Sequence, residues 1–300
     1  MIATTGFFDG VHLGHRAVLR RVLEMARLQG KESAVITFWP HPRVILHYEA
    51  EKVRLLNALD EKKKLLYEAG INHVWVIPFT SELASYSPEQ FFRDYLLQQF
   101  RVSDLVVGYD HHLGNNAGAD CETMKEIGAS MGIAVEQIPA VNAGEAGSHH
   151  PNSISSTKIR EALQVGDISF ANACLGYLYM LQGVVVEGDK IGRTIGFPTV
   201  NLQLYEPLKQ VPAGGVYAVQ VAHAGKAYRG MMNIGVRPTI KKSPVRTIET
   251  HIFDFDEDVY GQSVEIRVVA RIRDEQQFSS IEALKTQLAT DKQKCGSIKM

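Results

Sequence analysis

GFFDGVHLGH, residues 6–15, directly follows a short β-prone run at the start of the chain and decides the fold of the first domain. Gly6 and Gly10 permit tight turns and a close approach of the backbone to a ligand. His12 and His15 lie three residues apart, so they share one face of the helix expected to begin near His12. A strand, a glycine-rich turn and a helix start together present backbone N–H groups and a favourable dipole to a phosphate. The stretch therefore predicts a phosphate site at the end of the first strand.

Strand-like and helical runs alternate after this motif. Buried strands are predicted at residues 33–38, 73–77, 104–107 and 133–135, and helices at residues 59–69, 88–98 and 122–131. Alternation of this kind, with apolar strands, predicts a parallel sheet with helices on both faces. Ligands of such α/β folds bind at the carboxyl ends of the strands, which is where the opening motif lies. An α/β domain is therefore expected over residues 1–167.

The hydrophobic pattern changes after about residue 166. Apolar and polar residues then alternate in short runs, separated by turn residues, at residues 181–186, 216–222, 247–253 and 264–272. Such a pattern is typical of a compact β-barrel or sandwich. We predict an antiparallel barrel over residues 181–300, ending in an amphipathic helix at about residues 280–288. Residues 168–180 form the predicted connector between the two domains.

Composition limits the function classes that the chain can have. Its 300 residues are 45% hydrophobic and 22% charged, which suits two folded domains. A net charge of −1 without a basic block argues against nucleic acid as a partner. No signal peptide or membrane-spanning run is evident, so a cytoplasmic protein without membrane partners is expected. Cys121, Cys174 and Cys295 are far apart and predict neither disulfides nor a cysteine-rich zinc site. The sequence leaves open whether copies of the chain form a weak homo-oligomer.

The opening motif has less specific interpretations as well. Two histidines in HxxH spacing suit a metal, but zinc needs a third ligand and no cysteine is nearby. The nucleotide motifs GxGxxG and GxxxxGK[ST] are both absent. The complete pattern GxxDxxHxGH, which adds Asp9 and Gly14, is far more specific than a glycine-rich turn alone.

A second phosphate element is predicted at SISSTKIREAL, residues 153–163. Ser155, Ser156 and Thr157 place hydroxyls at an expected helix N-terminus, and Arg160 follows one turn later. Hydroxyls, backbone amides and a guanidinium can together clamp a phosphate. Simple helix capping is the alternative interpretation.

These two motifs resemble the nucleotidylyltransferase superfamily, whose members carry HxGH after their first strand. SSTKIR is similar to the adenylyltransferase module of bacterial bifunctional FAD synthetases, and VVGYDHHLGNN, residues 106–116, is similar to that family's strand-end stretch. The resemblance implies a Rossmann-like domain that adenylylates FMN, with catalytic roles for His12, His15 and Arg160. At residues 111–113 this chain has His-His-Leu, where the family usually has aromatic and basic residues. The implied nucleotide-binding residues are Gly6, Asp9, Gly14, Gly108, Asp110, Ser155, Ser156 and Thr157.

The second half contains another distinctive stretch, GRTIGFPTVN, which begins at Gly192. Gly192 and Gly196 allow a flexible loop, and Pro198 fixes the backbone where the chain becomes extended. Thr199 and Asn201 lie two residues apart, so their side chains would face the same way on a strand. A hydroxyl and a carboxamide oxygen on one side can hold Mg²⁺ and phosphate groups. A glycine-rich hairpin is the alternative interpretation.

The motifs around this loop follow the order seen in riboflavin kinases. They are GVYAV at residues 215–219, MNIGVRPT at residues 232–239 and IETHIFDFDEDVYG at residues 248–261. The resemblance implies that Glu249 accepts the proton of the ribityl 5′-hydroxyl. One carboxylate is enough, because a neutral alcohol loses a single proton as it attacks phosphorus. The residues implied to bind nucleotide are Gly192, Arg193, Gly196, Pro198, Thr199 and Asn201, and the last two are also the implied Mg²⁺ ligands.

The complete chain is therefore expected to carry out two reactions, both with ATP and Mg²⁺. The barrel would phosphorylate riboflavin to FMN, and the α/β domain would adenylylate FMN to FAD with release of pyrophosphate. A transferase with a single activity and a degenerate second domain is one alternative. A flavin-binding regulator is another, but it predicts loss of Glu249, Thr199 or the HxGH pair, and all of these are present.

Overall fold

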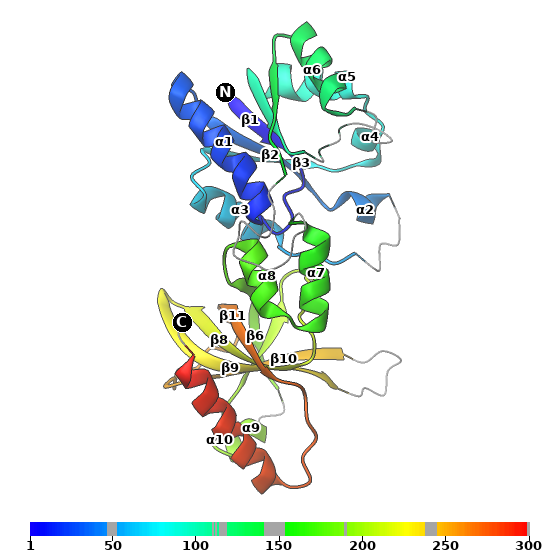
Figure 1. Cartoon of the computed structure of the whole chain (residues 1–300). Helices are drawn as coiled ribbons and strands as arrows, with labels where there is room; N and C mark the ends of the chain where they lie inside the picture. The colour runs from blue at the N-terminus through cyan, green and yellow to red at the C-terminus, as the bar shows by residue number, and fades with distance from the viewer. Residues whose placement is uncertain are drawn as a thin grey trace. The chain divides into compact units, whose positions relative to one another are not determined.

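The computed structural model describes residues 1–46, 53–109, 111, 113, 119–140, 154–188, 191–237 and 245–298. The chain forms two compact units, Met1–Ser156 and Thr157–Met300 (Figure 1). Among the described residues, no helix combines the length and apolar character that crossing a membrane requires.

The first unit is built on a 5-stranded parallel sheet with the strand order β3-β2-β1-β4-β5. Its strands are β1 (Ile2–Thr5), β2 (Ser33–Trp39), β3 (His73–Pro78), β4 (Asp104–Val107) and β5 (Ala134–Gln137). Its helices are α1 (Leu13–Gln29), α2 (Pro42–Ile45), α3 (Leu59–Glu68), α4 (Ser81–Ala84), α5 (Pro88–Phe91), η2 (Phe92–Gln99) and α6 (Cys121–Ser130). The predicted parallel α/β fold is therefore confirmed.

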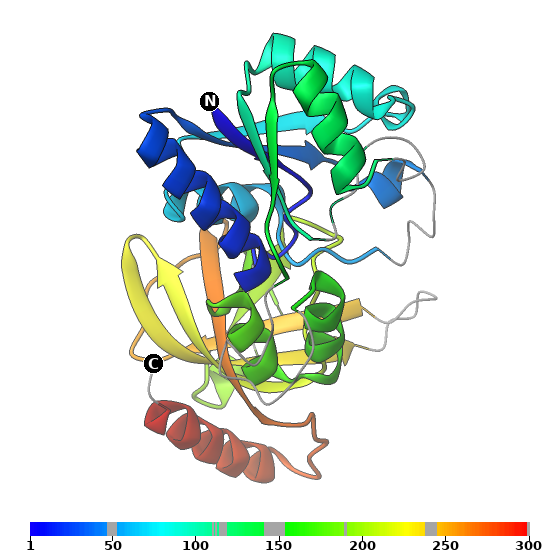
Figure 2. The same cartoon turned by 45° about the horizontal axis from the view of Figure 1, so that its top comes forward.

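Helices cover both faces of this sheet (Figure 2). Helix α1 packs against β1 and β4 through a buried stripe that runs from Val18 to Ala26. On the other face, Phe92, Leu96 and Met124 join the apolar side chains of the strands in one core cluster. The strand order reverses between β1 and β4, and sheets of this kind bind ligands at such a reversal. The HxGH turn follows β1 at this position.

Capping residues set the limits of α1. The His12 side chain accepts a hydrogen bond from the His15 N–H at the N-terminus, and Gly30 ends the helix with a left-handed φ of 62°. The single helix predicted at residues 88–98 is instead the short α5 followed by the π-helix η2. Apolar periodicity predicts a helical segment but does not distinguish α-helical from π-helical hydrogen bonding.

The second unit is a closed antiparallel barrel with the strand order β10-β7-β6-β11-β8-β9. Its strands are β6 (Tyr179–Val186), β7 (Val200–Leu204), β8 (Gly215–His223), β9 (Lys226–Arg237), β10 (Val245–Ile252) and β11 (Ser263–Arg273). The helices after the first unit's sheet are α7 (Ser156–Val165), α8 (Ile168–Leu175), α9 (Ile191–Thr194) and α10 (Ile281–Ser297). The barrel prediction is confirmed, and the sandwich alternative does not apply.

The terminal helix α10 is longer than its predicted span of 280–288. Ser280 caps it, and the helix continues to Ser297. A fully buried Asp291 ties it to β11, because this carboxylate accepts a hydrogen bond from Arg273 Nε at 2.9 Å. The helix is therefore held by a charged contact as well as by its apolar side.

Candidate active sites

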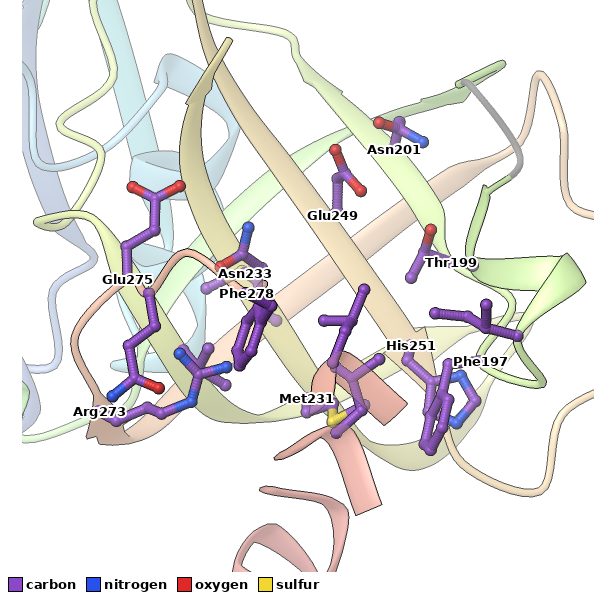
Figure 3. Close-up of a pocket in the computed structure, with 17 residues that line it drawn as sticks. Phe197, Thr199, Asn201, Met231, Asn233, Glu249, His251, Arg273, Glu275 and Phe278 are labelled. Carbon is purple, nitrogen blue, oxygen red and sulfur yellow. The ribbon is translucent and has the colours of Figure 1, made fainter. Parts of the chain in front are cut away.

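A cavity of about 380 Å³ lies within the barrel unit (Figure 3). Thr199, which directly precedes β7, lines one side of it together with Asn201 of β7 and Glu249 of β10. Glu249 is the cross-strand partner of Asn201, and on its other side it pairs with Asn233 of β9. Strand register therefore brings the predicted carboxylate next to the predicted carboxamide, although 48 residues separate Asn201 from Glu249 (249 − 201 = 48).

The rest of the cavity is mainly apolar. Its hydrophobic lining comes from Ile195, Phe197, Val216, Met231, Met232, Phe278, Leu284 and Leu288. A planar aromatic molecule buries well against such a surface, since apolar area removed from water contributes about 25 cal/mol per Å². The cavity thus combines an apolar compartment with a polar side that carries one of the predicted catalytic groups.

The GRTIGFPTVN loop is folded back on itself at this polar side. The Phe197 N–H donates to the Gly192 carbonyl at 2.8 Å. A Cβ on Gly192 would lie 2.3 Å from the Phe197 carbonyl oxygen and 3.5 Å from the Thr199 hydroxyl. Gly188 has a similar role, because a Cβ there would lie 2.1 Å from the Asn201 side-chain nitrogen. The glycines therefore leave room for the loop to close around Thr199 and Asn201.

His251 lies on the same side of β10 as Glu249 and also lines the cavity. Its Nδ1 is 2.7 Å from the Pro198 carbonyl oxygen, and its ring packs edge-on against Phe197. Burial lowers the pKa of His251 from its usual 6.5, although the bond to Pro198 acts in the opposite direction. A neutral imidazole that donates to the Pro198 carbonyl fixes the loop.

The outer wall of the cavity comes from the segment between β11 and α10. Arg273, Glu275 and Phe278 line the cavity there, and the Arg273 guanidinium lies 5.7 Å from the Phe278 ring. Asp291 holds the same guanidinium through Nη2 at 2.8 Å. These residues were not predicted from the sequence, because charged residues near a terminal helix usually indicate an exposed surface.

A smaller hollow of about 200 Å³ is lined by Pro198 and Thr199 of the GRTIGFPTVN loop. Arg193 lines it from the loop, and the exposed residues 256–258 line it from the turn after β10. Thr199 therefore borders both hollows, whereas Glu249 lines only the larger of the two.

The HxGH residues lie close together in the first unit. The His12 and His15 rings stack with 3.6 Å between their centroids, and the His12 Nδ1 accepts from the His15 N–H at 3.3 Å. Gly14 makes this possible, because a Cβ there would lie 3.1 Å from the His12 ring. Burial, followed by the nearby His12 and Lys62, holds the pKa of His15 well below 6.5. His15 is therefore a neutral imidazole, and its Nδ1 has no hydrogen-bond partner among the described residues.

Asp9 supports the turn ahead of these histidines. Its buried carboxylate accepts hydrogen bonds from the backbone N–H groups of Leu56 at 2.9 Å and Asn57 at 3.1 Å. Its backbone carbonyl accepts the Ser156 hydroxyl at 2.8 Å. Asp9 therefore joins the turn after β1 to the segment before α3 and to the start of the SSTKIR motif.

The other predicted nucleotide residues of this domain are spread over several elements. Gly6 and Gly108 directly follow β1 and β4, and Ser155 immediately precedes α7. Thr157 and Arg160 lie on α7 in the part of the chain that belongs to the second unit. The predicted Asp110, and the His112 of the divergent stretch, lie outside the described residues.

No group of three or more His, Cys, Asp or Glu side chains is arranged to hold a metal within the described parts of the chain. The Thr199 hydroxyl and the Asn201 side-chain carbonyl are neutral oxygen groups that line the barrel cavity. Hard cations such as Mg²⁺ accept ligands of this kind together with phosphate oxygens.

Family models and known proteins match both units. A model described as FAD synthetase matches residues 1–158, and one described as riboflavin kinase matches residues 175–299. The chain is 36% identical to the bifunctional riboflavin kinase/FMN adenylyltransferase of Listeria monocytogenes and 37% identical to that of Bacillus subtilis, in each case over 97% of this chain and 90% of the relative. It is also similar to a crystal structure described as a macrolide-efflux protein from Streptococcus pneumoniae. That similarity has a TM-score of 0.89 at 30% identity and covers 99% of this chain and 94% of the other.

Proposed function

The chain belongs to the family of bifunctional riboflavin kinase/FMN adenylyltransferases, and from this premise we propose which of its residues carry out the two reactions. The chain phosphorylates riboflavin with ATP to give FMN, and it adenylylates FMN with ATP to give FAD and pyrophosphate. The proposed kinase domain is residues 181–300, the adenylyltransferase domain is residues 1–167, and residues 168–180 connect them.

In the kinase reaction, Glu249 accepts the proton of the ribityl 5′-hydroxyl as this oxygen attacks the γ-phosphorus of ATP. The observation that supports this role is the convergence of Glu249, Thr199 and Asn201 on one side of a cavity that also has an apolar compartment. The flavin ring packs in the apolar compartment, so its ribityl chain extends toward Glu249. The ATP phosphates lie along the loop from Gly192 to Pro198. Thr199, which directly follows this loop, lines both hollows.

Mg²⁺ fits this polar side. Thr199 and Asn201 supply neutral oxygen ligands there. Gly188 and Gly192 lie so close to these two residues that neither glycine position has room for a Cβ. When bound, Mg²⁺ neutralises phosphate charge and aligns the leaving group. Thr199 and Asn201 orient the ion, while Glu249 handles the proton.

In the adenylylation reaction, the FMN phosphate attacks the α-phosphorus of ATP and pyrophosphate leaves. His12 and His15 donate hydrogen bonds to the phosphate oxygens, and neutral imidazoles are suited to this because each ring carries one N–H. The other proposed nucleotide-binding residues of this reaction are Ser155, Ser156, Thr157, Arg160, Gly6, Gly14, Gly108 and Asp110. Asp9 is a further proposed nucleotide-binding residue, and its carboxylate also holds the turn in front of the histidine pair.

We also propose that the protein works in the cytoplasm, because all three of its cysteines are free and buried, as a reducing compartment favours. Its partners are the small-molecule substrates.

Incubation with riboflavin, ATP and Mg²⁺, followed by chromatography of the flavins, tests the two assignments together. FMN should appear first and FAD should follow. If FMN accumulates without FAD, the adenylylation assignment fails. If riboflavin stays unchanged while added FMN gives FAD, the kinase assignment fails. If neither flavin reacts, the assay is repeated with CTP in place of ATP, and a reaction then shows a different nucleotide preference. If no product forms with either nucleotide, the chain is a flavin-binding protein without these activities.

A further inference from the structure

Lys62 is a fully buried lysine that neither proposed reaction uses. It lies on α3 in the first unit and is 1% exposed. Burying an ammonium group is costly unless polar groups replace its water. A lysine in this position therefore calls for a physical reason.

The Lys62 ammonium is directed at the turn after β1. Its Nζ donates to the Phe7 carbonyl at 2.8 Å and to the Thr37 hydroxyl at 3.2 Å. The Thr37 hydroxyl lies 3.2 Å from the same Phe7 carbonyl and donates to it. The ammonium also lies 3.9 Å from the centroid of the Phe7 ring, which is within cation–π distance. Both the backbone and the side chain of Phe7 are thus fixed by Lys62.

This turn needs support because its backbone is strained. Phe8 has a φ of 53° and Val11 has a φ of 36°, in the left-handed region that bulky and β-branched residues avoid. The turn leads directly to His12, whose side chain caps α1 and stacks on His15. Any movement of Phe7 would therefore be transmitted to the histidine pair within a few residues.

Charge connects Lys62 to the same histidines. Burial is the main cause of the low pKa of His15, and the nearby His12 and Lys62 lower it further. Burial also lowers the pKa of Lys62 itself to about 8, while the carboxylate of Asp9 opposes this shift. At neutral pH the ammonium is therefore charged, and it loses its proton in the weakly alkaline range.

We propose that Lys62 is a positioning residue for FMN adenylylation, a role that rests on the proposed activity of the first domain. Its ammonium holds the Phe7 carbonyl, so that the strained turn presents His12 and His15 in one geometry. The same ammonium adds a buried positive charge near the phosphates that the turn is proposed to bind.

Replacement of Lys62 in the full-length protein tests this role. Lys62→Met keeps the length of the side chain and removes its charge and donors, so kcat for FMN adenylylation should fall roughly 10- to 100-fold. Lys63→Met is the matched control, because Lys63 is the next residue on α3 and its side chain is 39% exposed. It should change kcat by less than about twofold. Riboflavin phosphorylation by the same preparations should be unchanged in both variants.

Two pH measurements separate positioning from simple structural support. In the wild-type protein, kcat for adenylylation should decrease as the pH rises through about 8, where Lys62 loses its charge. Lys62→Arg should retain activity at alkaline pH, since a guanidinium does not titrate there. In an NMR titration, the pKa of His15 should be higher in Lys62→Met than in the wild type or in Lys63→Met.

Wild-type kcat in Lys62→Met, or an unchanged His15 titration, would overturn the proposal. A wild-type profile without an alkaline decrease would also overturn it, and this measurement does not depend on whether a variant folds. Failure of the proposed function looks different, because the wild-type protein would then form no FAD from FMN at any pH. The His15 titration needs no turnover and would still decide whether Lys62 acts on His15.

Discussion

Glu249 is the residue on which the proposed kinase chemistry depends. It lies beside Asn201 in the barrel and on the same side of the cavity as Thr199. A carboxylate at this place can take the hydroxyl proton as the oxygen–phosphorus bond forms. Its amide analogue would keep the shape of the side chain but could not accept the proton.

We therefore expect Glu249→Gln to lower kcat for riboflavin phosphorylation by roughly 10²- to 10⁴-fold. Adenylylation of added FMN should be unchanged in the same protein, and chromatography of the two products measures both. Glu282→Gln, an exposed carboxylate on α10, is the control and should leave both rates unchanged. Equal loss of the two activities in Glu249→Gln would indicate misfolding instead of a missing base.

Two histidines link stability to pH. Burial lowers the pKa values of His15 and His251 below 6.5, so near and below that pH the unfolded chain binds more protons than the folded chain. Stability rises with pH wherever the unfolded state binds more protons. The free energy of unfolding should therefore decrease as the pH falls below 6.5. His251→Asn should lose less stability than the wild type between about pH 7.5 and pH 5 in urea titrations, and an equal loss would show that His251 does not contribute.

At the scale of elements, the loop from α9 to β7 shows how sterics place the ligand groups. Its closure depends on a hydrogen bond from Phe197 to Gly192 and on a contact too close for any side chain at residue 192. The rest of the loop is held by the bond between His251 and Pro198. Space, more than backbone flexibility, is therefore the reason for a glycine at residue 192.

We expect Gly192→Ala to displace the Phe197 carbonyl and Thr199, and to lower kcat/KM for riboflavin phosphorylation roughly 10- to 100-fold. Gly296→Ala is the matched control, because Gly296 lies within α10 and has no neighbour within 4 Å of its added Cβ. That substitution should raise stability by up to about 1 kcal/mol through helix propensity, with unchanged kinetics. Wild-type kinetics in Gly192→Ala would show that the loop has room to spare.

At the scale of the whole molecule, FMN is the product of one reaction and the substrate of the other. Each unit has a core of its own: an α/β core in the first and a closed barrel in the second. Two reactions that share only a small molecule can in principle occur on different copies of the chain.

A mixture of Glu249→Gln and His15→Ala proteins tests this. Neither variant alone should convert riboflavin to FAD, because each lacks one step. The mixture should form FAD after a lag in which free FMN accumulates, and time-resolved chromatography would show both species. FMN that accumulates without FAD in the mixture would mean that FMN must pass between the sites of one molecule.

Much of this arrangement could be predicted from local sequence. The strand-like run at residues 104–107 predicts β4 to the residue, and Thr199 and Asn201, which lie two residues apart, both line one cavity. Lys62 and Asp291 could not be identified in this way. Each lies in a helix rich in charged residues, where a single charged side chain is usually solvated. In α3, Lys62 has helical spacing to Leu65 and Leu66, but only the structure shows that all three are buried.

The sequence by itself determined the α/β and barrel folds and the family, because hydrophobic period and motif spacing are local properties of the chain. Only the tertiary structure decided that Glu249 faces Asn201, that Asp9 supports a turn, and that Lys62 lies against Phe7. These facts depend on strand register and on packing between distant segments. Burial then sets the charge of His15, because desolvation acts on a group only after its surroundings have assembled.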